Sequence, residues 1–140
     1  MSINKSYNFK VKASTEKLAE VRRFVANNAE KHHYSKQDIE DVRLAVDEAF
    51  TNIIKHAYNY DENKKVKIEL DIDNEKICVS LFDEGKSFDV TNYKMPDIQQ
   101  QIKNKKRGGM GVYLINKLMD DVQYLKEGDI NEIKMCKKRS

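Results

Sequence analysis

Residues that break regular structure are scarce in this 140-residue chain, and long hydrophobic runs are missing. The chain has one proline and five glycines, and Pro96 falls with four of the glycines between residues 85 and 111. No stretch of about 18 apolar residues is present, which excludes a membrane-spanning helix. The N-terminal segment, MSINKSYNFK, lacks the apolar core of a signal peptide. We therefore expect a cytoplasmic protein.

Cysteine and histidine are also few. Cys78 and Cys136 both fall in strand-like segments, and we expect them to be reduced thiols, as is usual in the cytoplasm. Neither cysteine has a histidine at the spacing of a zinc site. The three histidines are scattered along the chain, so a metal-ligand role is not expected for them.

Charge of one sign is not in large excess. The 26 Lys and Arg residues against 23 Asp and Glu residues give a net charge of +3, which is too little to indicate nucleic-acid binding. One basic run, residues 103–107, contains no aromatic side chain on which a base could stack. Nucleic-acid binding through this run is therefore disfavoured.

Alternating and helical hydrophobic patterns divide most of the chain into strands and helices. Strands are predicted at residues 6–12, 65–73, 77–82, 121–126 and 131–137, and helices at about 15–32, 35–58 and 112–119. Turn residues at Asp73-Asn74 and at Gly128 join the later strands into two hairpins. The expected fold class is α+β, a two-layer sandwich in one domain spanning residues 1–140. A mixed, mostly antiparallel sheet would carry the helices on one face.

The segment between Gly85 and Gly109 is the exception to this regular pattern. It shows little apolar periodicity and is long for a connection within a compact domain. Such a segment is kept mainly as a lid or binding loop, or it is disordered. We favour a lid.

The predicted second helix carries two polar side chains beside its buried stripe. Glu48 and Asn52 are four residues apart, so they lie one above the other, next to the small residues Ala45 and Ala49. This arrangement leaves room for a polar ligand. An incidental pair on a solvated helix edge remains the alternative from this helix alone.

Two other segments offer groups that suit a nucleotide. Asp83 follows a buried strand, where its carboxylate could accept hydrogen bonds from a ligand, and Gly85 would let a flat ligand approach the backbone. The segment Gly108-Gly109-Met110-Gly111 opens a helix whose free N–H groups suit phosphate, and Arg107 adds positive charge. A strand-terminating turn and a flexible loop are the alternative explanations. The glycines match neither a P-loop nor a Rossmann fingerprint.

The order and spacing of these segments resemble a known superfamily. Glu48-x-x-x-Asn52, Asp83-x-Gly85 and Gly108-Gly109-x-Gly111 are similar to the N, G1 and G2 boxes of the gyrase, heat-shock chaperone, histidine-kinase and mismatch-repair ATPases. Within that superfamily, residues 42–58 and 83–89 most resemble those of the bacterial anti-sigma-factor serine kinases. The resemblance spans nearly the whole chain and implies the Bergerat, or histidine kinase-like, ATPase fold.

The resemblance implies a role for each matching residue. Asn52 would coordinate Mg²⁺, and Glu48 would be the catalytic base that polarises a serine hydroxyl. Asp83 would accept a hydrogen bond from the adenine amine of ATP. The glycines Gly85, Gly108, Gly109 and Gly111 would allow close backbone approach, Arg107 would lie near the phosphates, and residues 86–107 would form the ATP lid.

Departures from the family pattern concern the adenine contacts. The family usually has a threonine after a glycine in its last hairpin, whereas this chain reads Gly128-Asp129-Ile130-Asn131-Glu132. Asn131 is therefore the expected substitute. Lys86 and Ser87 also stand where other members of the superfamily carry glycine. These differences put details of the adenine contact in question, not the pocket.

By resemblance, the chain is expected to be an ATP-dependent serine protein kinase that acts as an anti-sigma factor. It would bind a sigma factor and phosphorylate a serine of an anti-anti-sigma antagonist, and it would form a homodimer by pairing through its sheet. The alternative is a non-catalytic ATP-binding switch that sequesters a partner protein. The retained Glu48 favours catalysis, because a pure binder has no need for an acid beside the metal.

Overall fold

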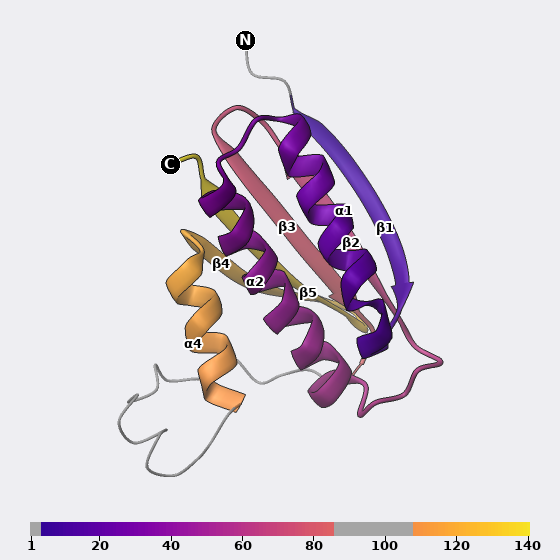
Figure 1. Ribbon diagram of the computed structural model, residues 1–140. Helices are drawn as coiled ribbons and strands as arrows, with labels where there is room; N and C mark the ends of the chain where they lie inside the picture. The colour runs from indigo at the N-terminus through magenta and orange to yellow at the C-terminus, as the bar shows by residue number, and fades with distance from the viewer. Residues whose placement is uncertain (1–3, 86–107) are drawn as a thin grey trace.

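The molecule consists of one sheet and one layer of helices that covers a single face of it (Figure 1). The computed structural model describes residues 4–85 and 108–140, with side chains in the second range from Tyr113 onward. The predicted lid, residues 86–107, lies outside the described residues, and so does Arg107. The two layers confirm the expected α+β sandwich.

The sheet has five strands in the order β1-β2-β3-β5-β4. They are β1 (Lys5–Lys12), β2 (Lys65–Ile72), β3 (Lys76–Asp83), β4 (Asp121–Glu127) and β5 (Ile130–Lys138). All the pairings among these described strands are antiparallel, where we expected a mixed but mostly antiparallel sheet. Both predicted hairpins are confirmed, and Gly128 turns the second with a φ of 60°. The register sets Asp83, at the end of β3, opposite Asn131 near the start of β5.

The helix layer is centred on α2 (Lys36–Asn52), which packs against both α1 (Leu18–Lys31) and α4 (Gly108–Leu118). A single 3-10 turn, Thr15–Lys17, precedes α1. The Ser35 hydroxyl accepts a hydrogen bond from the Asp38 N–H at 3.1 Å, which satisfies one of the free donors at the start of α2. After Asn52 the helix continues as a π-helical segment, Ile53–Ala57.

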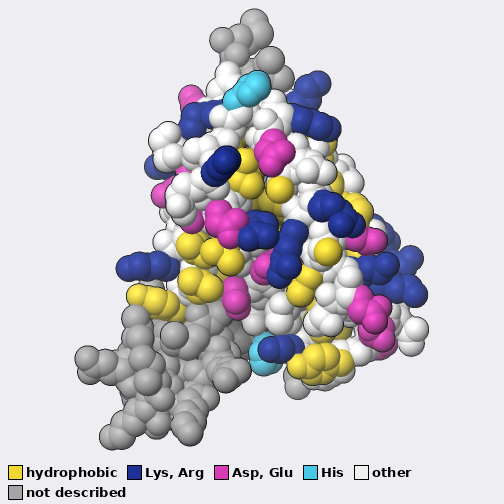
Figure 2. All heavy atoms as spheres, viewed as in Figure 1, with side chains coloured by type: hydrophobic (Ala, Val, Ile, Leu, Met, Phe, Trp, Pro, Cys, Tyr) yellow, Lys and Arg dark blue, Asp and Glu magenta, His cyan; other side chains and the backbone are white. Residues whose placement is uncertain are grey.

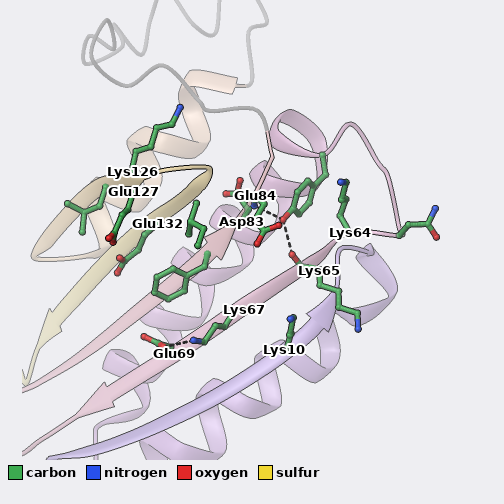
Figure 3. Close-up of a pocket in the computed structure, with 15 residues that line it drawn as sticks. Lys10, Lys64, Lys65, Lys67, Glu69, Asp83, Glu84, Lys126, Glu127 and Glu132 are labelled. Atoms are coloured by element: carbon green, nitrogen blue, oxygen red, sulfur yellow. Dashed lines mark hydrogen bonds and ion pairs between the residues drawn. The ribbon is translucent and has the colours of Figure 1, made fainter.

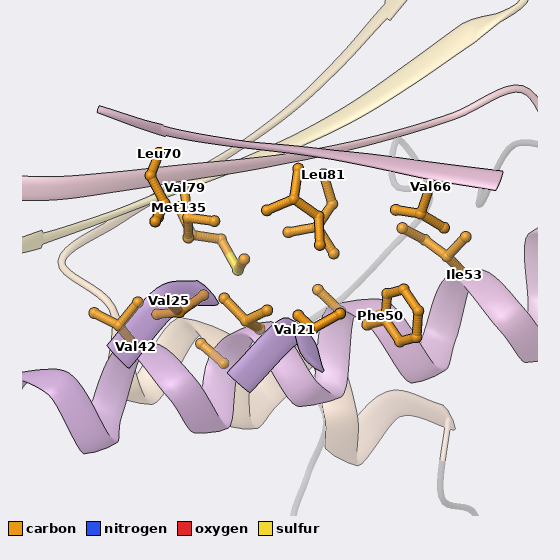
Figure 4. Close-up of a cluster of buried hydrophobic side chains, with 14 of the residues drawn as sticks. Val21, Val25, Val42, Phe50, Ile53, Val66, Leu70, Val79, Leu81 and Met135 are labelled. Carbon is orange, nitrogen blue, oxygen red and sulfur yellow. The ribbon is translucent and has the colours of Figure 1, made fainter. Parts of the chain in front are cut away.

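The core lies between the helices and the inward-facing side chains of the strands. Figure 4 shows Val21, Val42 and Phe50 of the helices facing Val66, Leu70, Val79 and Leu81 of the strands. Each large apolar side chain buried here contributes about 1.5–3 kcal/mol relative to exposure. The outward-facing residues of β2 are polar, which is the pattern of an antiparallel sheet with one open face. Among the described residues, no helix has the length and apolar character needed to span a bilayer.

One prediction about the sheet is wrong. Cys78 and Cys136 are joined by a disulfide, where we expected two reduced thiols. They lie directly opposite each other on the neighbouring strands β3 and β5, with Cα atoms 4.1 Å apart. The two cysteines are 58 residues apart in sequence, so their proximity comes from the strand register and leaves no trace in the local pattern.

Candidate nucleotide-binding site

The two polar residues of α2 lie where the helical pattern predicted. Val46, Ala49 and Phe50 are buried against the core, and Glu48 and Asn52 lie partly exposed at the margin of that stripe. Neither Glu48 nor Asn52 has a hydrogen bond or ion pair with another described residue. Their carboxylate and carboxamide oxygens are therefore available, and oxygens of this kind are the ligands that Mg²⁺ prefers. The residues present fit a magnesium ion at this position.

An ion pair between helices fixes the orientation of α2 beside Glu48. Arg22 of α1 donates from Nε to both carboxylate oxygens of Asp47, at 3.0 and 2.9 Å. The hydrogen bond and the charge of Asp47 raise the pKa of Arg22. A two-point contact of this kind restrains direction as well as distance. Since Asp47 precedes Glu48, the contact limits the rotation of the helix that carries the candidate base.

The end of this helix is tied to two strands through Tyr58. The Tyr58 hydroxyl accepts a hydrogen bond from the Glu84 N–H and donates one to the Lys65 carbonyl, each at 2.8 Å. Burial raises the pKa of Tyr58. The π-helical turn just before it is a form that occurs frequently at functional sites. Tyr58 therefore connects the end of the helix to the end of β3 and the start of β2.

Gly85 packs against the last turn of the helix. A Cβ atom at this position would lie 2.5 Å from the Ala57 carbonyl oxygen and 2.8 Å from Cδ1 of Tyr58. We expected the missing side chain to make room for a ligand. The structure shows a different reason: the backbone of residue 85 lies too close to the helix end for any side chain.

Three of the predicted site residues form one hydrogen-bonded network at the end of β3. The Asp83 Oδ1 atom accepts from the Gly85 N–H at 2.9 Å and from Nδ2 of Asn131 at 3.0 Å. Nδ2 of Asn131 also donates to the Gly85 carbonyl at 3.0 Å. Asp83 is 8% exposed, so its carboxylate is held in a defined orientation inside the structure.

The remaining predicted residues approach this network from neighbouring elements. Tyr58 links the network to the helix that carries Glu48 and Asn52. The glycines Gly108, Gly109 and Gly111 lie in the first turn of α4, which packs against α2. Figure 1 shows that α4 begins at the end of the molecule where α2 ends. Because Arg107 lies outside the described residues, its place near the phosphates stays a prediction.

Tyr58 is a residue of this candidate site to which the sequence reasoning assigned no role. The pattern predicted that the helix would end at this residue but assigned no role to its side chain. Tyr58 stands four residues after the buried Ile54, so it belongs to the buried side of the helix, where a hydroxyl needs a partner. That requirement is the signal that could have identified it.

A concavity of about 770 Å³ lies on the face of the sheet away from the helices, and Tyr58 and Asp83 are among the residues that line it. Figure 3 shows Lys10, Lys65 and Lys67 on one side of it and Glu127 and Glu132 on the other. Glu48 and Asn52 do not line it. On the opposite, helix-bearing face, charged side chains of both signs are interspersed over the described part (Figure 2).

Comparisons with known proteins identify the family of the chain. Residues 11–137 match the histidine kinase-like ATPase domain family. The serine-protein kinases RsbW of Bacillus cereus and of Bacillus thuringiensis subsp. konkukian are each 35% identical over 120 residues, which cover 83% of this chain and 74% of the relative.

Two solved structures have a similar fold. The crystal structure of the RsbU and RsbW domains of Rv1364c from Mycobacterium tuberculosis has a TM-score of 0.69 at 13% identity. That match covers 97% of this chain, which spans only 33% of the other chain. The SiaB–SiaC complex from Pseudomonas aeruginosa has a TM-score of 0.62 at 15% identity, covering 94% and 89% of the two chains. At these identities the matches support the fold alone. The family match and the RsbW relatives establish that the chain belongs to the histidine kinase-like ATPase family, in the branch that includes the RsbW serine-protein kinases.

Proposed function

We propose that this protein is an ATP-dependent serine kinase that binds a sigma factor and phosphorylates a serine of an anti-anti-sigma antagonist. The observation that carries the proposal is the position of Glu48. Its free carboxylate lies one helical turn before Asn52, on a helix whose end is tied through Tyr58 to the Asp83 network. A candidate base and a candidate adenine acceptor are thereby fixed on one rigid framework.

Each residue has a role that follows from its chemistry. Asp83 accepts a hydrogen bond from the adenine amine, and the N–H groups at the start of α4 face the phosphates. The Asn52 side-chain oxygen would hold Mg²⁺, which would neutralise phosphate charge when bound. Phosphoryl transfer then depends mainly on positioning and electrostatics.

Glu48 handles the proton of the transfer step. The serine oxygen of the antagonist forms a bond to the γ-phosphorus, and the bond from that phosphorus to the β–γ bridging oxygen breaks. ADP leaves with the electron pair of the broken bond. The serine hydroxyl proton passes to the Glu48 carboxylate, as in general-base catalysis.

The substitution Glu48→Gln tests this role, because it keeps the size of the side chain and removes its basicity. Transfer of labelled phosphate from ATP to the antagonist should fall about 10²–10⁴-fold, while ATP binding persists. Glu40→Gln is the matched control, since Glu40 lies on the same helix and forms an ion pair with Arg43 at the surface. Full transfer by Glu48→Gln would refute the assignment. If the wild type binds ATP and partner without transferring label, the non-catalytic switch is the correct function.

We also propose that the open face of the sheet forms the homodimer contact. The strand register places Lys10, Lys67, Phe82, Glu132 and Leu125 in one row. The row is basic on β1–β2 and acidic on β5, with the partly exposed apolar residues Phe82 and Leu125 in it (Figure 3). A two-fold axis through such a face brings each basic half against an acidic half.

Charge reversal tests this contact. Lys67→Glu should shift the protein toward monomer in sedimentation analysis. Adding Glu132→Lys to the same chain should restore the dimer, because both charges exchange places across the axis. An unchanged dimer in the single variant would exclude this face as the contact.

A further inference from the structure

The amide of Asn131 satisfies two acceptors at once. Its nitrogen lies 3.0 Å from Asp83 Oδ1 and 3.0 Å from the Gly85 carbonyl oxygen. A carboxylate and a carbonyl can only accept, and an amide NH₂ has one hydrogen for each of them. A threonine hydroxyl has a single hydrogen and could serve only one of them. The side chain of Asn131, where this chain departs from the family pattern, is therefore suited to the two acceptors beside it.

The hydrogen bond from Asn131 also affects the Asp83 carboxylate. Oδ1 carries two N–H donors, from Gly85 and Asn131, whereas Oδ2 has no hydrogen-bond partner among residues 4–85 and 113–140. Two donors on one oxygen restrain the rotation of the carboxylate. Oδ2 is thus left as the acceptor available to a ligand, in a fixed direction.

We propose that Asn131 is a positioning residue that aims Asp83 Oδ2 at the exocyclic amine of a purine, and so makes the site prefer a 6-amino over a 6-keto purine. Both amide hydrogens of Asn131 are taken by the protein, so its nitrogen does not itself contact the base. The inference rests on the proposed nucleotide site. A 6-keto group would set an acceptor against Asp83 Oδ2 in place of the donor that a 6-amino group supplies.

Two substitutions separate this role from a merely structural one. Asn131→Asp is nearly isosteric but removes both donors and places a second carboxylate beside Asp83. Asn131→Thr keeps one donor and restores the residue usual in the family. Asn27→Asp is the matched control, because it makes the same chemical change at an exposed position of α1, away from the site and from the open face of the sheet.

The measurement is the dissociation constant of each variant for ATP, inosine triphosphate and purine riboside triphosphate, which has no group at position 6. Wild type and Asn27→Asp should bind ATP about tenfold more tightly than purine riboside triphosphate, as expected for one hydrogen bond to a charged group. In Asn131→Asp this ratio should fall to near one, while affinity for purine riboside triphosphate stays within about threefold of wild type. Asn131→Thr should be intermediate.

Several results would overturn the inference. It is wrong if folded Asn131→Asp keeps the preference for ATP, or if it weakens all three nucleotides equally. If Asn131→Asp does not fold, Asn131→Thr decides, and an unchanged preference in that variant rejects the inference. A wild type that binds all three nucleotides equally also rejects it but leaves the proposed function intact. If the wild type binds none of the three nucleotides, both the inference and the proposed function are wrong.

Discussion

Substitution of Gly85 by alanine should damage the fold through a clash inside the protein. The added Cβ would lie 2.5 Å from the Ala57 oxygen and 2.8 Å from both the Ala57 carbonyl carbon and Cδ1 of Tyr58. Two of these atoms belong to the backbone of the helix end, which cannot move aside as the tip of a flexible side chain could. The strand end and the helix end must therefore separate.

The size of the effect follows from this crowding. Overpacking costs about 1–3 kcal/mol, and contacts this short against backbone favour the upper end of that range. For a domain of this size, each kcal/mol lowers Tm by about 4 °C. We therefore expect Gly85→Ala to lower Tm by roughly 10 °C.

Gly128 provides the comparison that isolates crowding from backbone strain. It has a φ of 60°, but a Cβ added to it would have no other atom within 4 Å. Gly128→Ala should cost about 1 kcal/mol from the left-handed conformation, and Gly128→Asn should cost less because asparagine tolerates that conformation. Gly85→Asn should be no better than Gly85→Ala.

Thermal unfolding followed by circular dichroism is a sufficient assay for these four variants. Tm should be highest for Gly128→Asn, lower for Gly128→Ala and lowest for the two Gly85 variants. A Tm for Gly85→Ala within about 2 °C of wild type would refute the close packing of the β3 end against the helix end.

Two further predictions concern Tyr58 and the cysteine pair. Tyr58→Phe should cost about 1–3 kcal/mol because a buried donor and acceptor lose their partner. Since burial raises the folded-state pKa of Tyr58, its contribution to stability is complete below about pH 10 and is lost as pH rises further. Chemical denaturation at pH 8 and at about pH 11 should therefore show that Tyr58→Phe loses less unfolding free energy at high pH than the wild type does. Some loss should remain in the variant, because burial also raises the pKa of Tyr34. An equal loss in the two proteins contradicts the assignment. Reduction of the Cys78–Cys136 disulfide, which spans 58 residues, should lower the free energy of unfolding by up to about 4 kcal/mol. Thiol titration of the denatured, unreduced protein should detect no free thiol, and two free thiols would show that the bond does not form.

The sequence was informative wherever a local period determines the position of a side chain. Glu48 and Asn52 were placed correctly because a helix repeats every 3.6 residues and brings positions four apart together. The hairpins were predicted for the same reason, since strand alternation and turn residues are both local signals.

Features that depend on long-range register could not be predicted in this way. The pairing of Cys78 with Cys136 and of Asp83 with Asn131 follows from β3 lying beside β5, and nothing within either strand specifies its neighbour. Gly85 was identified as important from the sequence. The Ala57 carbonyl, which leaves no space for a side chain at residue 85, comes close only through the contact between a strand end and a helix end.

The most direct test of the account is calorimetric titration of Mg·ATP into the wild type and Asp83→Asn. The substituted side chain keeps an oxygen for the Gly85 and Asn131 donors and replaces the other oxygen with an NH₂ group, so the fold should persist. We predict one ATP site in the wild type and at least about tenfold weaker binding in Asp83→Asn. Equal affinity in the two proteins would contradict the claim that adenine is recognised at the end of β3.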